Sequence, residues 1–132
     1  MKKFGILLTA IVFTTGLLSF SIQQEKWVVP EKDKKVKNPV EASKENFNQG
    51  KILYSKHCKS CHGSKGLGDG IKAKNLKGNL GNFSSEAFQK QTDGELFYKS
   101  YIGRNDMPNF EKKITDKDDV WAIVHYMRTL KK

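Results

Sequence analysis

The most constraining feature of this chain is a pair of cysteines with two residues between them and a histidine directly after the second. The five residues read Cys58-Lys59-Ser60-Cys61-His62, and the 132-residue sequence has no other cysteine. Pairs with this spacing occur in thioredoxin-like redox motifs, in zinc sites and at the attachment sites of c-type haem. These sites need different surroundings, so the rest of the sequence distinguishes between them.

The first two alternatives fit the sequence poorly. Thioredoxin-like motifs lie near a βαβ pattern, which is absent here. His57, Cys58, Cys61 and His62 offer four zinc ligands, but structural zinc sites usually draw theirs from two separated segments. Haem attachment uses every element, because both thiols form thioethers with vinyl groups and the histidine binds the iron. We therefore predict one covalently bound haem c at Cys58 and Cys61, with His62 as an iron ligand.

The start of the chain has the pattern of an export signal. Two lysines are followed by an uncharged run of 19 residues from Phe4 to Ile22, with a possible cleavage site at Ser19-Phe20-Ser21. The run is also long enough to cross a bilayer. Residues 1–22 are therefore predicted to be a signal peptide or a membrane anchor. In either case the protein is expected in the periplasm, soluble or anchored to the inner membrane by residues 4–22.

Residues 23–44 are expected to form a disordered, charged linker. They contain Pro30 and Pro39, a single aromatic residue, Trp27, and no helical periodicity. Such a composition offers too little apolar surface to offset the entropy that is lost on ordering. If the anchor is retained, this linker is a flexible membrane tether. The folded domain is predicted to span residues 45–132.

The hydrophobic pattern of this domain predicts helices and no strands, and hence an all-α fold. Phe47, Leu53 and Tyr54 recur at helical spacing, which indicates a helix from residue 45 into the cysteine motif. Six glycines at positions 63–81 predict a long loop after the motif.

Three further helices are predicted beyond this loop. Thr92 and Glu95 have the spacing of a capping box, and the helix that they open is expected to stop at Gly103. A last helix is predicted from Thr115, where three aspartates near its start suit the helix dipole. A short helix is predicted over residues 85–91.

A second iron ligand has to come from elsewhere in the chain. The candidates are His57, His125, Met107 and Met127. His57 adjoins the first cysteine and cannot easily reach the opposite side of the ring. His125 and Met127 lie in the last predicted helix, where an exposed face or a core position also explains them. Met107 lies in a loop between two helices, and Pro108 restricts its backbone to extended geometry.

Several short motifs follow one another in the order of a known family. They are Gly50-x-x-x-Tyr54-x-x-x-Cys58, Cys61-His62-Gly63, Gly68-Asp69-Gly70, Thr92-Asp93-Gly94-Glu95-Leu96-Phe97, Met107-Pro108-x-Phe110 and Trp121-x-x-x-x-Tyr126-x-x-x-Leu130. With them, residues 45–130 resemble a class I (mitochondrial-type) cytochrome c, in the form of a small bacterial monohaem c-type cytochrome. The resemblance implies a cytochrome c fold, in which the N-terminal and C-terminal helices cross around one covalently bound haem.

The resemblance also implies roles for individual residues. Met107 is expected to be the second iron ligand, opposite His62. Gly50 is expected to lie where the first helix of the domain crosses the last one, near Ile123. The ring is expected to pack among four aromatic residues, Phe83, Phe97, Tyr101 and Phe110.

An iron that binds both a histidine and a methionine has no open position for a substrate. We therefore expect electron transfer and no enzymatic activity, with redox proteins as partners and no small-molecule substrate. The neutral thioether of methionine raises the reduction potential relative to ligation by two histidines. Two alternatives stay open: a five-coordinate haem enzyme or gas-binding centre, if Met107 does not ligate, and a dedicated electron-transfer subunit of a larger respiratory complex.

The chain is strongly basic. Its formal net charge is +10, and removal of Lys2 and Lys3 leaves +8. Residues 51–78 contain seven lysines and a single acidic residue, Asp69, so a positive field is expected around the haem attachment site. We expect redox partners with acidic docking faces, and a protein that is a monomer. Export and the haem argue against binding to nucleic acid.

Overall fold

The computed structural model describes residues 26–132 of the chain. The predicted signal peptide or anchor, residues 1–22, lies outside the described residues. The helices are α1 (Glu31–Lys34), α2 (Lys44–His57), α3 (Lys59–His62), α4 (Glu86–Gln89), α5 (Asp93–Ile102) and α6 (Lys117–Arg128), with one 3₁₀ turn, η1 (Ala73–Asn75). Residues 26–132 contain no strand, which confirms the all-α prediction. No helix in this part of the chain has the length and hydropathy needed to cross a bilayer.

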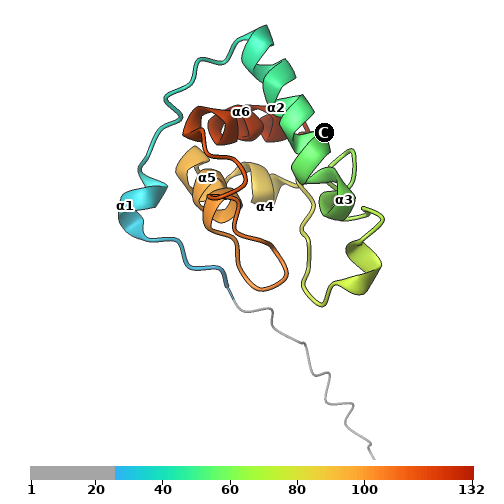
Figure 1. Ribbon diagram of the computed structural model, residues 1–132. Helices are drawn as coiled ribbons and strands as arrows, with labels where there is room; N and C mark the ends of the chain where they lie inside the picture. The colour runs from blue at the N-terminus through green and yellow to red at the C-terminus, as the bar shows by residue number, and fades with distance from the viewer. Residues whose placement is uncertain (1–25) are drawn as a thin grey trace, which may run out of the picture.

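Helices α2 and α6 cross each other (Figure 1). Gly50 lies at the crossing, where a Cβ atom would come within 2.6 Å of the carbonyl carbon of Ala122. One turn later, the ring of Tyr54 is fully buried and packs against Tyr126, with their centroids 5.1 Å apart. The crossing is the one that the resemblance to class I cytochrome c implies, and the missing side chain at Gly50 lets the two backbones approach this closely.

Helix α5 has the capping box that the sequence predicts. The side chain of Thr92 accepts a hydrogen bond of 3.1 Å from the backbone N–H of Glu95, and the Glu95 carboxylate accepts one of 2.8 Å from the Thr92 N–H. The helix ends before Gly103, whose φ of +72° is a conformation that glycine adopts without strain. Both ends of α5 are therefore fixed by local chemistry.

The other two predicted helices are shorter than expected. Helix α6 begins at Lys117 and not at Thr115, because Asp116 is its N-cap and accepts at Oδ1 a hydrogen bond of 2.9 Å from the N–H of Asp118. Helix α4 covers four residues of the predicted range 85–91, and the side chain of Ser85 caps it. Asp118 and Asp119 lie in the first turn of α6, where they suit the helix dipole.

The core lies between α2, α5 and α6. Phe97 stacks on Trp121 with a centroid distance of 4.1 Å and on Tyr101 with one of 5.2 Å, which joins α5 to α6. The buried members of the core are Tyr54, Phe83, Leu96, Tyr101, Phe110, Ile114, Val120, Trp121, Ile123, Val124 and Met127.

Residues 26–43, which we call the N-terminal strap, run along one side of the domain past α5 to the start of α2 (Figure 1). Val29 is only 2% exposed. Helix α1 packs against α5, where a Cβ atom at Gly94 would come within 2.9 Å of the carbonyl oxygen of Val36. The amide of Asn38 donates a hydrogen bond of 3.1 Å to the carbonyl oxygen of Trp121. The strap is thus packed on the domain at several points.

This packing corrects the expectation of a disordered linker over residues 23–44, as far as the structure describes that range. The contacts join the strap to residues far away in the sequence. Besides the bond from Asn38, the Nε2 atom of His125 lies 2.7 Å from the carbonyl oxygen of Val40. Composition and periodicity report only local preference, so contacts of this kind leave no signal in them.

Candidate functional site

The cysteine motif lies where α2 ends and α3 begins. Cys58 is the C-cap of α2 and the N-cap of α3. Its carbonyl oxygen accepts hydrogen bonds from the backbone N–H of Cys61 at 3.1 Å and from that of His62 at 2.9 Å. Neither thiol is in a disulfide. Burial, followed by the neighbouring Cys61, raises the pKa of the Cys58 thiol to about 12. Both thiols line a cavity of about 250 Å³, which we call the smaller cavity.

The side chain of His62 is buried and held by one ring nitrogen. Its Nδ1 atom lies 3.0 Å from the carbonyl oxygen of Leu80. A protonated Nδ1 donates to this carbonyl, which leaves the lone pair of Nε2 free to bind a metal. Burial lowers the pKa of His62, which favours the neutral form that a metal needs. The ring of Phe83 packs against the imidazole with centroids 4.7 Å apart.

Glycines let the loop after the motif fold back against it. The N–H of Gly70 donates to the carbonyl oxygen of Cys61 at 3.1 Å, and a Cβ atom at Gly70 would come within 2.6 Å of the carbonyl carbon of Cys61. Gly66 has a φ of +67°, and its carbonyl oxygen accepts a hydrogen bond of 2.7 Å from the N–H of Phe83. The loop therefore places Phe83 next to His62, which explains why the sequence is so rich in glycine here.

Met107 lies at the end of a tight turn. The N–H of Met107 donates a hydrogen bond of 2.9 Å to the carbonyl oxygen of Arg104, and the N–H of Arg104 donates one of 2.9 Å to the carbonyl oxygen of Met107. Inside the turn, Asn105 has a φ of +53°, a conformation that asparagine tolerates better than most residues. The carboxylate of Asp106 accepts a hydrogen bond of 3.0 Å from the N–H of Lys77. The Met107 turn is thus tied to the loop that holds His62.

The predicted ligands lie where two cavities adjoin. The larger cavity has a volume of about 500 Å³, within the range of about 300–1,000 Å³ that is usual for ligand sites. His62 and Met107 line both the larger and the smaller cavity, together with Leu80 and Asp106. Apolar residues of the larger cavity are Trp27, Phe83, Phe88, Leu96 and Met127. The cysteines and both predicted ligands therefore surround one continuous region.

The other ligand candidates lie elsewhere or have other contacts. His57 packs edge-on against Phe110 at a centroid distance of 5.8 Å, and burial lowers its pKa. His125 bonds to the backbone of the N-terminal strap. Met127 is 4% exposed and lines the larger cavity, so it is a core residue that also faces the site.

Two of the four aromatic residues expected around the ring line a cavity. Phe83 lines the larger cavity and Phe110 the smaller one. Phe97 and Tyr101 line neither, because they stack with each other and Phe97 also stacks on Trp121. Trp27, which lies in the predicted linker, also lines the larger cavity. In the sequence, Trp27 is marked by being the sole aromatic residue in the charged segment 23–44.

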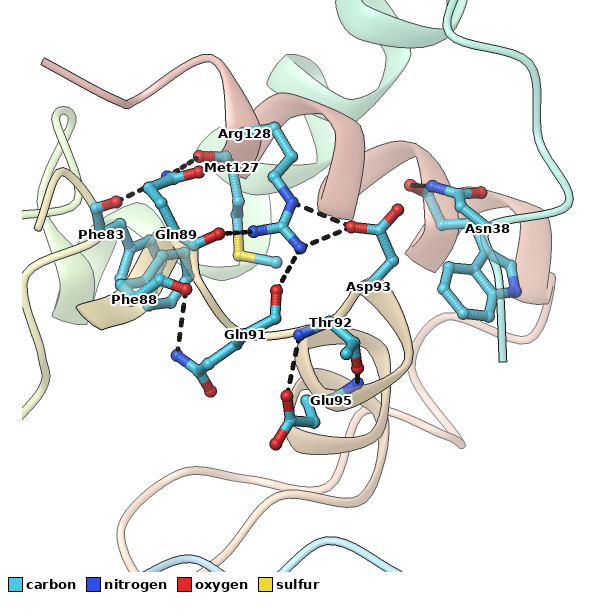
Figure 2. Close-up of polar contacts among 11 residues, drawn as sticks. Asn38, Phe83, Phe88, Gln89, Gln91, Thr92, Asp93, Glu95, Met127 and Arg128 are labelled. Atoms are coloured by element: carbon cyan, nitrogen blue, oxygen red, sulfur yellow. Dashed lines mark hydrogen bonds and ion pairs between the residues drawn. The ribbon is translucent and has the colours of Figure 1, made fainter. Parts of the chain in front are cut away.

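Figure 2 shows Arg128 in a network of hydrogen bonds beside residues that line the larger cavity. Its guanidinium donates two hydrogen bonds to Oδ1 of Asp93, at 2.6 and 2.9 Å, and one each to the carbonyl oxygens of Gln89 and Gln91. The amide of Gln89 in turn donates to the carbonyl oxygens of Met127 and of Phe83. The network joins α6 to α4 and α5 beside the residues that face the cavity.

The donor atoms of this site fit a covalently bound haem. Two free thiols lie beside an imidazole with one fixed nitrogen, and Met107, which carries a thioether, lines both adjoining cavities. The remaining wall of the larger cavity is largely aromatic and aliphatic, as a porphyrin requires. Within residues 26–132, no group of three or more His, Cys, Asp or Glu side chains is placed to hold a metal ion by itself.

Solved structures are similar to this one. The structure of the KustC0563 c-type cytochrome matches with a TM-score of 0.55 and 30% identity, over 63% of this chain and 98% of that one. The Kuenenia stuttgartiensis reducing HAO-like protein complex Kustc0457/Kustc0458 contains a chain with a TM-score of 0.60 and 24% identity. That match covers 71% of this chain and 47% of the other, and it supports the fold.

The match to a family model agrees with the site. No curated protein matches the chain. Residues 45–127 match the family described as Cytochrome C oxidase, cbb3-type, subunit III. This match covers the two cysteines, the histidine and the methionine described above, and cytochrome c domains bind haem c covalently. The chain therefore belongs to the cytochrome c family, in the group of cbb3-type oxidase subunit III domains.

Proposed function

We propose that the protein carries electrons in the cell envelope through one haem, attached to Cys58 and Cys61 and ligated by His62 and Met107. One observation supports this most directly. His62 and Met107 both line the larger and the smaller cavity, and the two cysteines line the smaller one. Four residues from two separate parts of the chain, the cysteine motif and the Met107 turn, thus converge on the region that a haem would fill.

The chain's own residues prepare this site for electron transfer. A bound haem supplies one-electron redox chemistry. The carbonyl oxygen of Leu80 orients His62 and makes its imidazole a stronger donor. The neutral thioether of Met107 favours the reduced iron and raises the reduction potential. Apolar side chains such as Phe83 keep water away, which favours the less charged state further.

The same ligands argue against an enzyme. With His62 and Met107 both bound, no coordination position is left for a small-molecule substrate. A five-coordinate haem enzyme or gas-binding centre would need Met107 to stay unbound, although its turn is tied down by Arg104 and by the Asp106–Lys77 hydrogen bond. We therefore propose that the protein acts on redox proteins and has no substrate of its own.

Lysines surround the side on which the cysteines lie. Lys56, Lys72 and Lys113 line the smaller cavity. Their field attracts acidic surfaces and increases the rate at which these approach the haem edge. We propose that a monomeric protein meets acidic faces of its redox partners here.

Residues 1–22 are the proposed route to the envelope, as a signal peptide or as an inner-membrane anchor. Haem c is attached outside the cytoplasm, which agrees with export. Fractionation of cells that express the full chain tests this. The proposal requires haem-containing protein in the periplasmic or the membrane fraction.

A second candidate is a dedicated electron-transfer subunit of a larger complex. It is favoured by the family match, whose description names an oxidase subunit. Purification from mild detergent distinguishes the two. A single-chain carrier elutes as a 15.0 kDa monomer or less, whereas a subunit co-elutes with partner chains.

The visible spectrum of the full chain tests the haem and its ligands. Haem that stays with the chain after extraction with acidified acetone, at one haem per chain, supports thioether attachment at Cys58 and Cys61. The weak red absorption band of a methionine–iron(III) bond should be present, and it should be lost in Met107→Ala. Met127→Leu is the matched control, since Met127 lines the same larger cavity. Retention of the band in Met107→Ala would falsify the proposed ligation.

A further inference from the structure

We infer that Trp27 of the N-terminal strap is a positioning residue for the Met107 turn and acts through Arg104. The inference rests on the proposed function, in which Met107 ligates the iron. It adds to the domain a part that lies outside residues 45–127, the range shared with the family.

Trp27 contacts the Met107 turn through a cation–π interaction. The guanidinium carbon of Arg104 lies 4.7 Å from the centroid of the Trp27 ring. On α5, the Nζ atom of Lys99 lies 6.0 Å from the same centroid. Both distances are within the range of about 6 Å in which a cation is attracted to an aromatic ring. Trp27 and Met107 also line the same larger cavity.

Arg104 transmits this contact to Met107. The backbone of Arg104 forms both hydrogen bonds that close the turn on Met107. Gly103 precedes it with a φ of +72°, and a Cβ atom there would come within 2.5 Å of the carbonyl carbon of Pro108, so the turn has little room on that side. A fixed Arg104 side chain therefore limits the motion of the Met107 backbone relative to α5.

The strap is held firmly enough to serve as a support. Val29 is buried two residues after Trp27, and α1 packs against Gly94 of α5. Further along, Asn38 donates its hydrogen bond to the backbone of Trp121. In Figure 1 the start of the strap lies beside the loop between α5 and α6, which contains the Met107 turn. The two parts are thus fixed independently and meet at Trp27.

Binding of imidazole to the oxidised, full-length holoprotein tests the inference, because imidazole has to displace Met107 from the iron. Trp27→Leu keeps an apolar side chain but removes the cation–π interaction. We expect it to increase the affinity for imidazole about three- to tenfold, which corresponds to the usual strength of such a contact. Trp27→Phe, which keeps an aromatic face, should restore most of the wild-type affinity.

Asn38→Ala separates positioning from general loosening of the strap. It removes the hydrogen bond to Trp121 and leaves the contact between Trp27 and Arg104 in place. We expect a lower unfolding midpoint with an unchanged affinity for imidazole. If Trp27→Leu binds imidazole as the wild type does, or if Asn38→Ala raises the affinity as much, the inference is wrong.

Met107→Ala separates this inference from the proposed function. If it raises the affinity for imidazole strongly while Trp27→Leu has no effect, the ligation stands and the positioning role of Trp27 fails alone. If Met107→Ala changes neither the affinity nor the red absorption band, Met107 is no ligand, and both proposals fail.

Discussion

Gly50 of α2 lies so close to Ala122 of α6 that a Cβ atom on the glycine would come within 2.6 Å of the alanine's carbonyl carbon. This contact sets the spacing of two helices that both reach the site. Helix α2 leads directly into the cysteine motif, and α6 contributes Met127 to the wall of the larger cavity. A change at the crossing therefore acts on the fold and on the site together.

Gly50→Ala is expected to destabilise the protein by about 1–3 kcal/mol, or more, because the added methyl group overlaps the backbone of Ala122. Unfolding in guanidinium chloride measures the change. The matched control is Gly78→Ala, since a Cβ atom at Gly78 would meet nothing within 4 Å. It should leave the stability unchanged or raise it by about 0.4–1 kcal/mol. Equal unfolding free energies for Gly50→Ala and the wild type would contradict the close packing.

Asp106→Ala is expected to weaken the bond between Met107 and the iron. The substitution removes the acceptor of the Lys77 N–H and so releases the Met107 turn from the loop that holds His62. A hydrogen bond of this kind contributes about 0.5–1.5 kcal/mol, which corresponds to an increase of about two- to tenfold in imidazole affinity. Asp106→Asn keeps an acceptor oxygen and should resemble the wild type. An equal increase in both variants would show that the charge of Asp106 matters and not its hydrogen bond.

Arg128→Ala is expected to destabilise the domain by about 2–3 kcal/mol, because it leaves the carboxylate of Asp93 and two backbone carbonyls without their donor. Thermal and denaturant unfolding measure this loss. Arg128→Lys should recover only part of it, since one ammonium group cannot reproduce the forked geometry. Lys131→Ala, at an exposed position three residues later, serves as control and should change the stability by less than about 0.5 kcal/mol.

Lys56→Gln is expected to slow electron exchange with an acidic redox protein, such as a reduced flavodoxin, about twofold at low ionic strength. The effect should fade as salt rises above 0.1 M, where the screening length falls below about 10 Å. The matched control is Lys44→Gln, which removes the same charge at the other end of the same helix, about 18 Å away. If both substitutions change the stopped-flow rate equally, the cause is the net charge of the protein and not a docking face near Lys56.

The sequence was sufficient to predict the parts of the fold that depend on local chemistry. The capping box of Thr92 and Glu95 fixes the start of α5. The helix crossing at Gly50 was implied by the resemblance to class I cytochrome c. The N-terminal strap escaped prediction because α1 has only four residues and its support comes from distant contacts. Helix α6 begins at Lys117, two residues after the predicted start at Thr115, because Asp116 is its N-cap, a choice between neighbouring side chains that composition does not decide.

The site was predictable where a motif carries the chemistry. The spacing of Cys58 and Cys61 predicts attachment of haem c, and the family match supports that cofactor. The role of Trp27 was not predictable, because its ring reaches the cavity only after the strap has folded past α5. Phe97 and Tyr101 have the aromatic character of cavity residues, but they stack on each other, and Phe97 also stacks on Trp121. Whether an aromatic ring packs in the core or lines the cavity depends on packing in three dimensions.

The strap also shortens any membrane tether. A flexible linker of 22 residues, as in positions 23–44, has a root-mean-square span of about 25 Å. With residues 26–43 packed on the domain, a retained anchor over residues 4–22 is followed by only the three residues 23–25 before the strap begins, and three residues reach at most about 11 Å. An anchored form would hold the Trp27 side of the cavity close to the lipid surface. Its electrons would then pass to partners at the bilayer plane, and the protein would not range through the periplasm to find them.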